Sequence, residues 1–193
     1  MRAAAPASPD RHGGNLAAAA LRLGCRPDQL LDASASLVPF PPPRRLRRAL
    51  AVAPLRPYPD RGYGALRRVI ADLHGLDPAW VLPGNGAAEL FTWAARDAAA
   101  AGLSLLPQPG FADYGRALAC WGGASAPLPL DLDWPEAGPM PWPAAADPAD
   151  GGRLAGGEAP AVLWITNPHN PTGQLWSRRS LEPLLARHAL VIC

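Results

Sequence analysis

The sequence contains no lysine, so all 18 of its basic residues are arginines. With 16 acidic residues the formal net charge is +2. The arginines form no continuous stripe of the sort that neutralises a phosphate backbone, and we therefore do not expect nucleic acid as a partner. The absence of lysine also removes the side-chain amine that some enzymes use for covalent catalysis.

Long apolar runs are absent and cysteine is scarce. Nowhere do about 18 apolar residues follow one another, and residues 1–14 lack the apolar core of a secretory signal, which predicts a cytoplasmic protein that does not enter a membrane. Cys25, Cys120 and Cys193 are too widely spaced for a C-x-x-C or zinc-ligand pattern. We expect buried, reduced thiols and no metal site.

The pattern of elements favours one α/β domain behind an irregular N-terminal arm. A chain of 193 residues, 49% of them hydrophobic, can enclose one sizeable core. From about residue 60 onward, helix and strand signals alternate as they do in a mostly parallel sheet with flanking helices. We place the arm at 1–57 and the domain at 58–193, and we treat the proline-, alanine- and glycine-rich stretch at 131–158 as an excursion without chemistry.

Periodicity and capping residues predict the individual elements. Leu66, Val69 and Leu73 fall on one helical face, and Gly75 follows as a stop signal. The run at 161–166 is continuously apolar, which predicts a parallel strand buried on both faces. The same reasoning gives helices at 63–74, 87–101, 111–121 and 177–187, and strands at 80–82, 103–106, 161–166 and 189–193.

The segment GNGAAE at 84–89 lies between an expected strand and an expected helix. Free backbone N–H groups and the helix dipole converge at such a point, which favours phosphate binding. Small residues at Gly86, Ala87 and Ala88 let an anion approach the backbone. The segment is neither a Walker loop nor a dinucleotide fingerprint, and an ordinary glycine turn fits the same pattern.

The motif NPHNPTG at 167–173 follows the expected strand at 161–166. Ligands bind where parallel strands end, and each Asn-Pro pair favours extended or turned backbone there. Asn170 offers both a donor and an acceptor, and its bond to Pro171 is a candidate cis peptide. We interpret Asn170 as a ligand-binding residue.

The segment PGFADY at 109–114 also follows an expected strand. It places the ring of Phe111 at the edge of the sheet, where it can cover a planar cofactor. A purely structural role for Phe111 in the core fits the same pattern.

In this order and at these separations, the three segments resemble the large domain of fold-type I pyridoxal-phosphate enzymes, the aspartate aminotransferase superfamily. Four further strings look like threonine-phosphate decarboxylase of cobalamin biosynthesis: HGGN at 12–15, PDQLLD at 27–32, YPD at 58–60 and FADYGRAL at 111–118. Histidinol-phosphate aminotransferase is the nearest similar family, and HGGN favours the decarboxylase. The resemblance implies an incomplete transferase large domain at 58–193, preceded by an arm and small-domain portion at 1–57.

The resemblance implies pyridoxal 5'-phosphate as the cofactor and assigns its contacts. The backbone N–H groups of Gly86, Ala87 and Ala88 would bind the cofactor phosphate, and Phe111 would stack on the ring. Asn170 would donate a hydrogen bond to the 3-oxygen and also contact the substrate.

The resemblance further implies a homodimer that acts on a small phosphorylated amino acid. Tyr58 would reach the cofactor phosphate of the neighbouring subunit, and His12, Gly13 and Ser36 would bind the substrate. The family pattern has asparagine where this chain has Ser36 and Val38. Serine can still donate a hydrogen bond, whereas valine offers nothing polar.

No catalytic residue is expected among these 193 residues. The resemblance puts the aspartate that faces the pyridine nitrogen just after the strand ending at Cys193, and the Schiff-base lysine further on. The implied reaction of the full-length family is decarboxylation of L-threonine O-3-phosphate to (R)-1-aminopropan-2-yl phosphate, and we expect this chain to be inactive alone. A histidinol-phosphate-type aminotransferase and a non-catalytic remnant of the fold stay open as alternatives.

Overall fold

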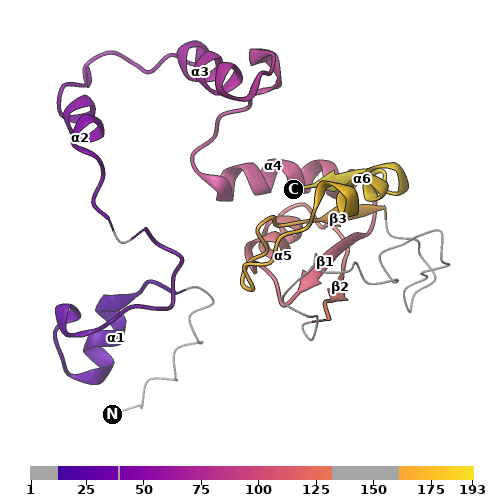
Figure 1. Cartoon of the computed structure of the whole chain (residues 1–193), viewed down its shortest axis with the longest axis horizontal. Coiled ribbons are helices and arrows are strands. Elements are labelled where there is room, and N and C mark those ends of the chain that lie inside the picture. The colour runs from indigo at the N-terminus through magenta and orange to yellow at the C-terminus, as the bar shows by residue number, and fades with distance from the viewer. Residues whose placement is uncertain (1–12, 39, 132–160) are drawn as a thin grey trace. The chain divides into compact units, whose positions relative to one another are not determined.

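The computed structural model of the chain describes residues 13–38, 40–131 and 161–193 (Figure 1). The chain divides into two compact units, Met1–Arg61 and Gly62–Cys193. His12 and nearly all of the excursion at 131–158 lie outside the described residues.

The N-terminal unit contains two short helices joined by irregular chain. α1 (Leu16–Leu23) begins at Asn15, whose side chain accepts a hydrogen bond from a first-turn amide at 3.2 Å, and it ends at Gly24 in the left-handed conformation. A 3₁₀ turn, η1 (Pro27–Gln29), and the helix α2 (Arg44–Ala51) follow. The arm is more regular than the sequence predicted, because Asn15 and Gly24 supply both caps of α1.

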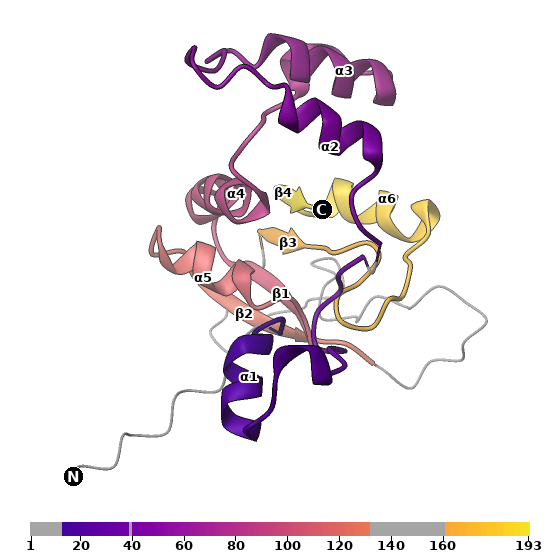
Figure 2. The same cartoon turned by 90° about the vertical axis from the view of Figure 1, so that its left-hand side faces the viewer.

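Among the described residues, four strands form one sheet in the C-terminal unit (Figure 2). In chain order they are β1 (Ser104–Gln108), β2 (Ser125–Pro129), β3 (Val162–Trp164) and β4 (Leu190–Ile192). Their order across the sheet is β2-β1-β3-β4 and every pairing is parallel, which confirms the predicted parallel sheet. The sequence does not predict β2, because Pro127 and Pro129 weaken its strand signal; its position at the edge tolerates them.

Helices cover both faces of the sheet. Their bounds are α4 (Ala87–Ala101), α5 (Asp113–Ala119) and α6 (Arg178–Arg187). α4 and α5 lie on one face and α6 lies on the other (Figure 2). The alternation along β3 explains this, since Val162 and Trp164 pack in the cluster with α4 and α5, whereas Leu163 packs in the cluster with Leu184 of α6. β3 is therefore buried on both faces, as its continuous apolar run predicts.

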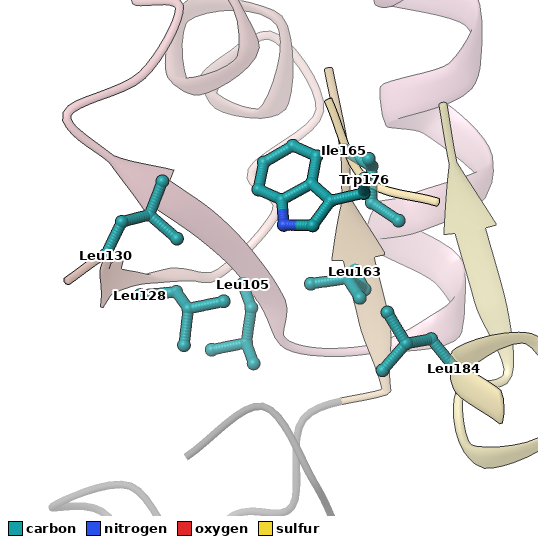
Figure 3. Close-up of a cluster of buried hydrophobic side chains, with 7 residues drawn as sticks. All are labelled: Leu105, Leu128, Leu130, Leu163, Ile165, Trp176 and Leu184. Carbon is teal, nitrogen blue, oxygen red and sulfur yellow. The ribbon is translucent and has the colours of Figure 1, made fainter. Parts of the chain in front are cut away.

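Figure 3 shows the cluster between the sheet and α6. Its buried members are Leu105, Leu128, Leu130, Leu163, Ile165, Trp176 and Leu184. Trp176 comes from the segment that follows β3 and directly precedes the N-cap of α6. Its place in the cluster anchors that segment to the core.

The sequence predicts most helix boundaries correctly. α3 (Gly64–His74) ends at Gly75 in the left-handed conformation, and α4 has the predicted bounds of 87–101. Ser177 caps α6 by accepting a hydrogen bond from a first-turn amide at 3.2 Å. α5 is shorter than the predicted helix at 111–121.

The predicted strand at 80–82 is wrong. The side chain of Asp77 accepts a hydrogen bond from the Ala79 amide at 2.7 Å and starts a 3₁₀ turn, η2 (Pro78–Trp80). Trp80 is 81% exposed, so its hydrophobicity does not reflect a place in the sheet. A strand needs a neighbour for its N–H and C=O groups, and the turn makes its bonds locally instead.

Two expectations drawn from composition have different outcomes. The three cysteines are free, but Cys120 and Cys193 are exposed and Cys25 is half-buried, so the predicted burial of the thiols is wrong. Cys120 ends the short helix α5, where its side chain faces solvent rather than the sheet. Within the described ranges, no helix is long and apolar enough to cross a membrane.

Two adjacent leucines of α6 test its packing on the sheet. Leu184 is 4% exposed in the core, whereas Leu185 is 61% exposed. We expect Leu184→Ala to lower the free energy of unfolding by about 2–4 kcal/mol because it leaves a cavity. Leu185→Ala removes the same atoms from the same helix and is expected to change it by less than about 0.5 kcal/mol. Urea unfolding measures both, and equal losses would contradict the packing of α6.

Candidate active site at the carboxyl edge of the sheet

The candidate site lies where the parallel strands end. β1 and β3 are neighbours, so the segments that follow Gln108 and Trp164 emerge at the same edge. α4 leads into the amino end of β1 through Gly102, which places the start of α4 at this carboxyl edge as well. A ring contact agrees with this, since Phe91 in the second turn of α4 lies 5.8 Å from Phe111 between ring centroids. The three predicted segments therefore meet at one edge.

The start of α4 presents backbone donors. Gly86 has φ 79° and ψ 172°, and a Cβ there would meet no atom within 4 Å. Ala87 and Ala88 are exposed, and no group among the described residues accepts a hydrogen bond from their amides. The carboxylate of Glu89 turns back and accepts from the Asn85 amide, so it does not cap the Ala87 or Ala88 amide. An open, positively polarised helix end of this kind suits a phosphate.

Arg116 ties the first turn of α4 to α5. Its Nη2 donates to the Ala88 carbonyl oxygen at 3.3 Å and to Asp113 Oδ2 at 2.9 Å. Asp113 is only 8% exposed, and its hydrogen bonds raise the pKa of the Arg116 guanidinium. Asp113 begins α5 two residues after Phe111, so this ion pair helps hold the helix start and the aromatic ring near each other.

Phe111 belongs to an aromatic cluster. It is half-buried, and its ring meets Tyr114 edge to face at 5.5 Å and 77°. The ring of Phe91 packs edge to face on that of Tyr114, with a centroid distance of 5.0 Å and an interplanar angle of 90°. The centroid of the Tyr114 ring lies 4.9 Å from that of the buried Trp164. Burial raises the pKa of the Tyr114 phenol, whose oxygen is 2.7 Å from the Thr166 hydroxyl. The rings of Phe91 and Tyr114 hold the ring of Phe111 in place, and part of the Phe111 ring stays accessible to solvent.

The NPHNPTG segment forms a compact turn after β3. Asn167 pairs with the backbone of Trp176, donating from Nδ2 to its carbonyl and accepting from its amide, both at 3.1 Å. The His169 amide donates to the Gln174 carbonyl at 2.7 Å. The Asn170–Pro171 bond is cis, as the sequence predicts, and Asn170 is exposed at the tip of the turn.

The side chain of His169 was missed as a site residue. Its Nε2 lies 2.8 Å from the Pro109 carbonyl oxygen, so it joins the segment after β3 to the segment after β1. Burial lowers its pKa from the ordinary histidine value, while the hydrogen bond to Pro109 acts in the opposite direction. Only its position inside the NPHNPTG string could have drawn attention to it.

Gly13 and Ser36, two of the predicted substrate residues, lie in the N-terminal unit, whereas Asn170 lies in the C-terminal unit. The Gly14 amide donates to Ser34 Oγ at 3.0 Å, and Ser34 donates to Asp32 Oδ1 from its amide at 2.8 Å and from its hydroxyl at 2.6 Å. The two hydrogen bonds from Ser34 lower the pKa of the Asp32 carboxyl. A Cβ on Gly13 would come within 1.8 Å of the Ser34 carbonyl oxygen, so only glycine fits. Gly13 therefore lies beside the segment that continues to Ser36.

The other predicted site residues have these positions. Ser36 is exposed between Ala35 and Leu37, whose carbonyl and amide are hydrogen-bonded at 2.9 Å. Tyr58 also belongs to the N-terminal unit and is 94% exposed. His12 lies outside the described residues. In the part of the chain that the structure describes, no group of three or more His, Cys, Asp or Glu side chains could hold a metal ion.

The sequence is similar to those of known aminotransferases and of a decarboxylase. A family model for aminotransferase class I and II matches residues 42–193. The chain is 35% identical over 189 residues to threonine-phosphate decarboxylase of Salmonella typhimurium, covering 91% of the chain and 46% of that protein. It is 32% identical over 179 residues to histidinol-phosphate aminotransferase of Natronomonas pharaonis, covering 88% and 46%. The chain thus spans about half the length of these relatives.

Solved structures share the fold. An aspartate aminotransferase from Thermotoga maritima has a TM-score of 0.65 at 22% identity, covering 91% of this chain and 48% of that one. L-threonine-O-3-phosphate decarboxylase from Porphyromonas gingivalis has a TM-score of 0.55 at 25% identity, covering 77% and 40%. Histidinol-phosphate aminotransferase from Sinorhizobium meliloti, solved with pyridoxal-5'-phosphate, has a TM-score of 0.57 at 22% identity, covering 76% and 38%. These likenesses confirm the predicted fold class.

Two glycines near Phe111 test the tight turn after β1. A Cβ on Gly110 would lie 2.1 Å from the Pro107 carbonyl oxygen, whereas a Cβ on Gly115, inside α5, meets nothing nearer than Leu106 Cδ1 at 4.0 Å. We expect Gly110→Ala to lower the free energy of unfolding by about 1–3 kcal/mol through this clash. Gly115→Ala is expected to raise it by about 0.5–1 kcal/mol because alanine favours the helix. Urea titrations give both values, and a neutral Gly110→Ala would contradict the turn.

Proposed function

The chain belongs to the aminotransferase class I and II family, and on that premise we propose that it supplies the cofactor-phosphate and ring contacts of a pyridoxal-phosphate-dependent decarboxylase. The proposed reaction converts L-threonine O-3-phosphate to (R)-1-aminopropan-2-yl phosphate, a step of cobalamin biosynthesis. The 35% identity to a threonine-phosphate decarboxylase over 91% of the chain is the observation that carries this choice within the family.

The described residues fit the cofactor. Its phosphate needs several donors, and the uncapped amides of Ala87 and Ala88 beside the open Gly86 provide them. Its ring needs a flat apolar cover, for which the half-buried Phe111 is held by neighbouring aromatic rings. Its 3-oxygen needs a donor, and the exposed amide of Asn170 at the same sheet edge can provide one.

The residues of this chain would act by binding and orientation. When bound, the cofactor ring would take up the electron pair released as the substrate carboxylate leaves. Ala87 and Ala88 would hold the phosphate end, and Phe111 would keep water from one face of the ring. Arg116 would keep the first turn of α4 in place through its bond to the Ala88 carbonyl. No lysine occurs among the 193 residues, so these contacts are non-covalent.

We assign one substrate contact to Asn170 and the others to residues of the N-terminal unit. His12 and Gly13 would contact the substrate phosphate, and the hydroxyl of Ser36 would donate a further bond. The Gly14–Ser34 hydrogen bond supports this, because it brings the glycine segment and the segment of Ser36 together. In the proposed homodimer, the exposed phenol of Tyr58 would reach the cofactor phosphate of the neighbouring subunit.

Histidinol-phosphate aminotransfer is the second candidate. It is favoured by the 32% identity to such an enzyme over 88% of the chain. Ser36 and Val38, which replace the asparagines of the decarboxylase pattern, weaken the case for threonine phosphate. Both candidates use the same cofactor contacts and differ in substrate and outcome.

Product analysis separates the two candidates. The protein, at the length its gene encodes, is incubated with the cofactor and L-threonine O-3-phosphate. We expect release of carbon dioxide and an amino alcohol phosphate, with no keto acid. Amino transfer from histidinol phosphate to an oxo acid, without carbon dioxide release, would contradict the decarboxylase and support the aminotransferase.

A proline substitution tests the phosphate contact. Ala87→Pro removes one amide donor, and proline suits the first helical position; the extended ψ of 172° at Gly86 is compatible with a following proline. We expect the affinity for pyridoxal 5'-phosphate to fall about 10-fold to 100-fold, as for loss of a hydrogen bond to a charged group. Fluorescence titration measures it.

Ala87→Ser is the matched control, because it changes the side chain and keeps the amide. It should bind the cofactor as the wild type does, and the thermal midpoints of both variants should stay near that of the wild type. Equal affinity in Ala87→Pro and Ala87→Ser would show that this amide does not bind the phosphate.

A further inference from the structure

His169 is buried and uses both its backbone and its side chain to join segments. It is 2% exposed. Its amide donates to the Gln174 carbonyl at 2.7 Å and its carbonyl accepts from the Gly173 amide at 2.6 Å, which closes the turn that carries Asn170. Its ring packs edge to face on Trp176 at 5.2 Å and 67°, and Trp176 lies in the core. The His169 ring is therefore held in place by a residue of the hydrophobic core.

The hydrogen bond from the ring fixes its protonation pattern. The partner of Nε2 is the Pro109 carbonyl oxygen at 2.8 Å. A carbonyl oxygen only accepts, so Nε2 carries the proton and donates. Nδ1 is buried and has no partner among the described residues, so a proton there would be costly. The neutral Nε2–H form is the one that the surroundings favour.

This bond connects the two segments that carry the ring contacts of the proposed site. Pro109 stands two residues before Phe111, and His169 stands directly before Asn170. The turn at Pro109 has little freedom, because Gly110 passes too close to the Pro107 carbonyl oxygen for any Cβ. A shift of Pro109 would therefore move Phe111 as well.

We propose that His169 is a positioning residue that sets the separation between the Phe111 ring and the Asn170 amide. It acts through these two residues and does not itself contact the cofactor. The inference rests on the proposed cofactor site and deepens it. Small errors in such a separation weaken binding strongly, because both contacts must be made by one rigid ring.

Three variants test the role. His169→Leu keeps an apolar side chain and removes the donor, whereas His169→Gln keeps an N–H group at about the reach of Nε2. The control is His188→Leu, since His188 is also buried at 7% exposure and its Nδ1 lies 3.0 Å from the Leu184 carbonyl oxygen. His188 precedes β4 and so lies at the opposite, amino edge of the sheet.

The measurement compares two ligands. The affinity for inorganic phosphate depends only on the amides at the start of α4. The affinity for pyridoxal 5'-phosphate depends on these amides and also on the contacts to the ring. We expect His169→Leu to weaken binding of pyridoxal 5'-phosphate about tenfold and to leave phosphate binding unchanged. His169→Gln should restore the affinity for pyridoxal 5'-phosphate, and His188→Leu should lower the thermal midpoint without changing either affinity.

The outcomes separate the inference from the proposed function. If the wild type binds pyridoxal 5'-phosphate and His169→Leu binds it equally well, the positioning role is wrong and the cofactor site stands. If His169→Leu loses both ligands together, the histidine supports the fold and not the ring contacts. If the wild type binds neither ligand, the proposed cofactor site is wrong and the inference fails with it.

Discussion

The burial of β3 on both faces is the constraint on which the rest of the C-terminal unit depends. Val162 and Trp164 pack toward α4 and α5, while Leu163 and Ile165 pack toward α6. A strand with two apolar faces needs a layer packed on each side, and helical layers joined by crossovers go with parallel pairing. The carboxyl edge of the sheet, and with it the place of the candidate site, is a consequence of this packing.

At that edge, two hydrogen bonds connect chain segments that the packing of the core places close together. Arg116 links α5 to the Ala88 carbonyl at the start of α4, and His169 links the turn after β3 to Pro109 after β1. In both bonds the acceptor is a backbone carbonyl oxygen, so each bond fixes the position of a chain segment. The neighbouring side chains and amides stay available to contact a ligand. The helix start, the ring of Phe111 and the turn of Asn170 are held by neighbours and still open to a ligand.

The two units divide the proposed chemistry between them. The C-terminal unit holds the residues assigned to the cofactor except Tyr58, which belongs with Gly13 and Ser36 to the N-terminal unit. The glycine segment there is fixed by Ser34 and Asp32 through short hydrogen bonds rather than by an apolar core. The proposed substrate contacts therefore depend on a few polar side chains, whereas the proposed cofactor contacts depend mainly on the sheet.

The sequence by itself determined the features whose causes are local. The bounds of α4, the Gly75 end of α3, the Ser177 cap of α6 and the cis bond at Asn170 follow from residues within a few positions of each other. The tertiary structure decided the features that need a distant partner: the edge strand β2 and the bond from His169 to a carbonyl 60 residues earlier in the chain. Strand pairing and buried hydrogen bonds depend on which groups meet after folding, and no periodicity or capping signal in a single segment contains that information.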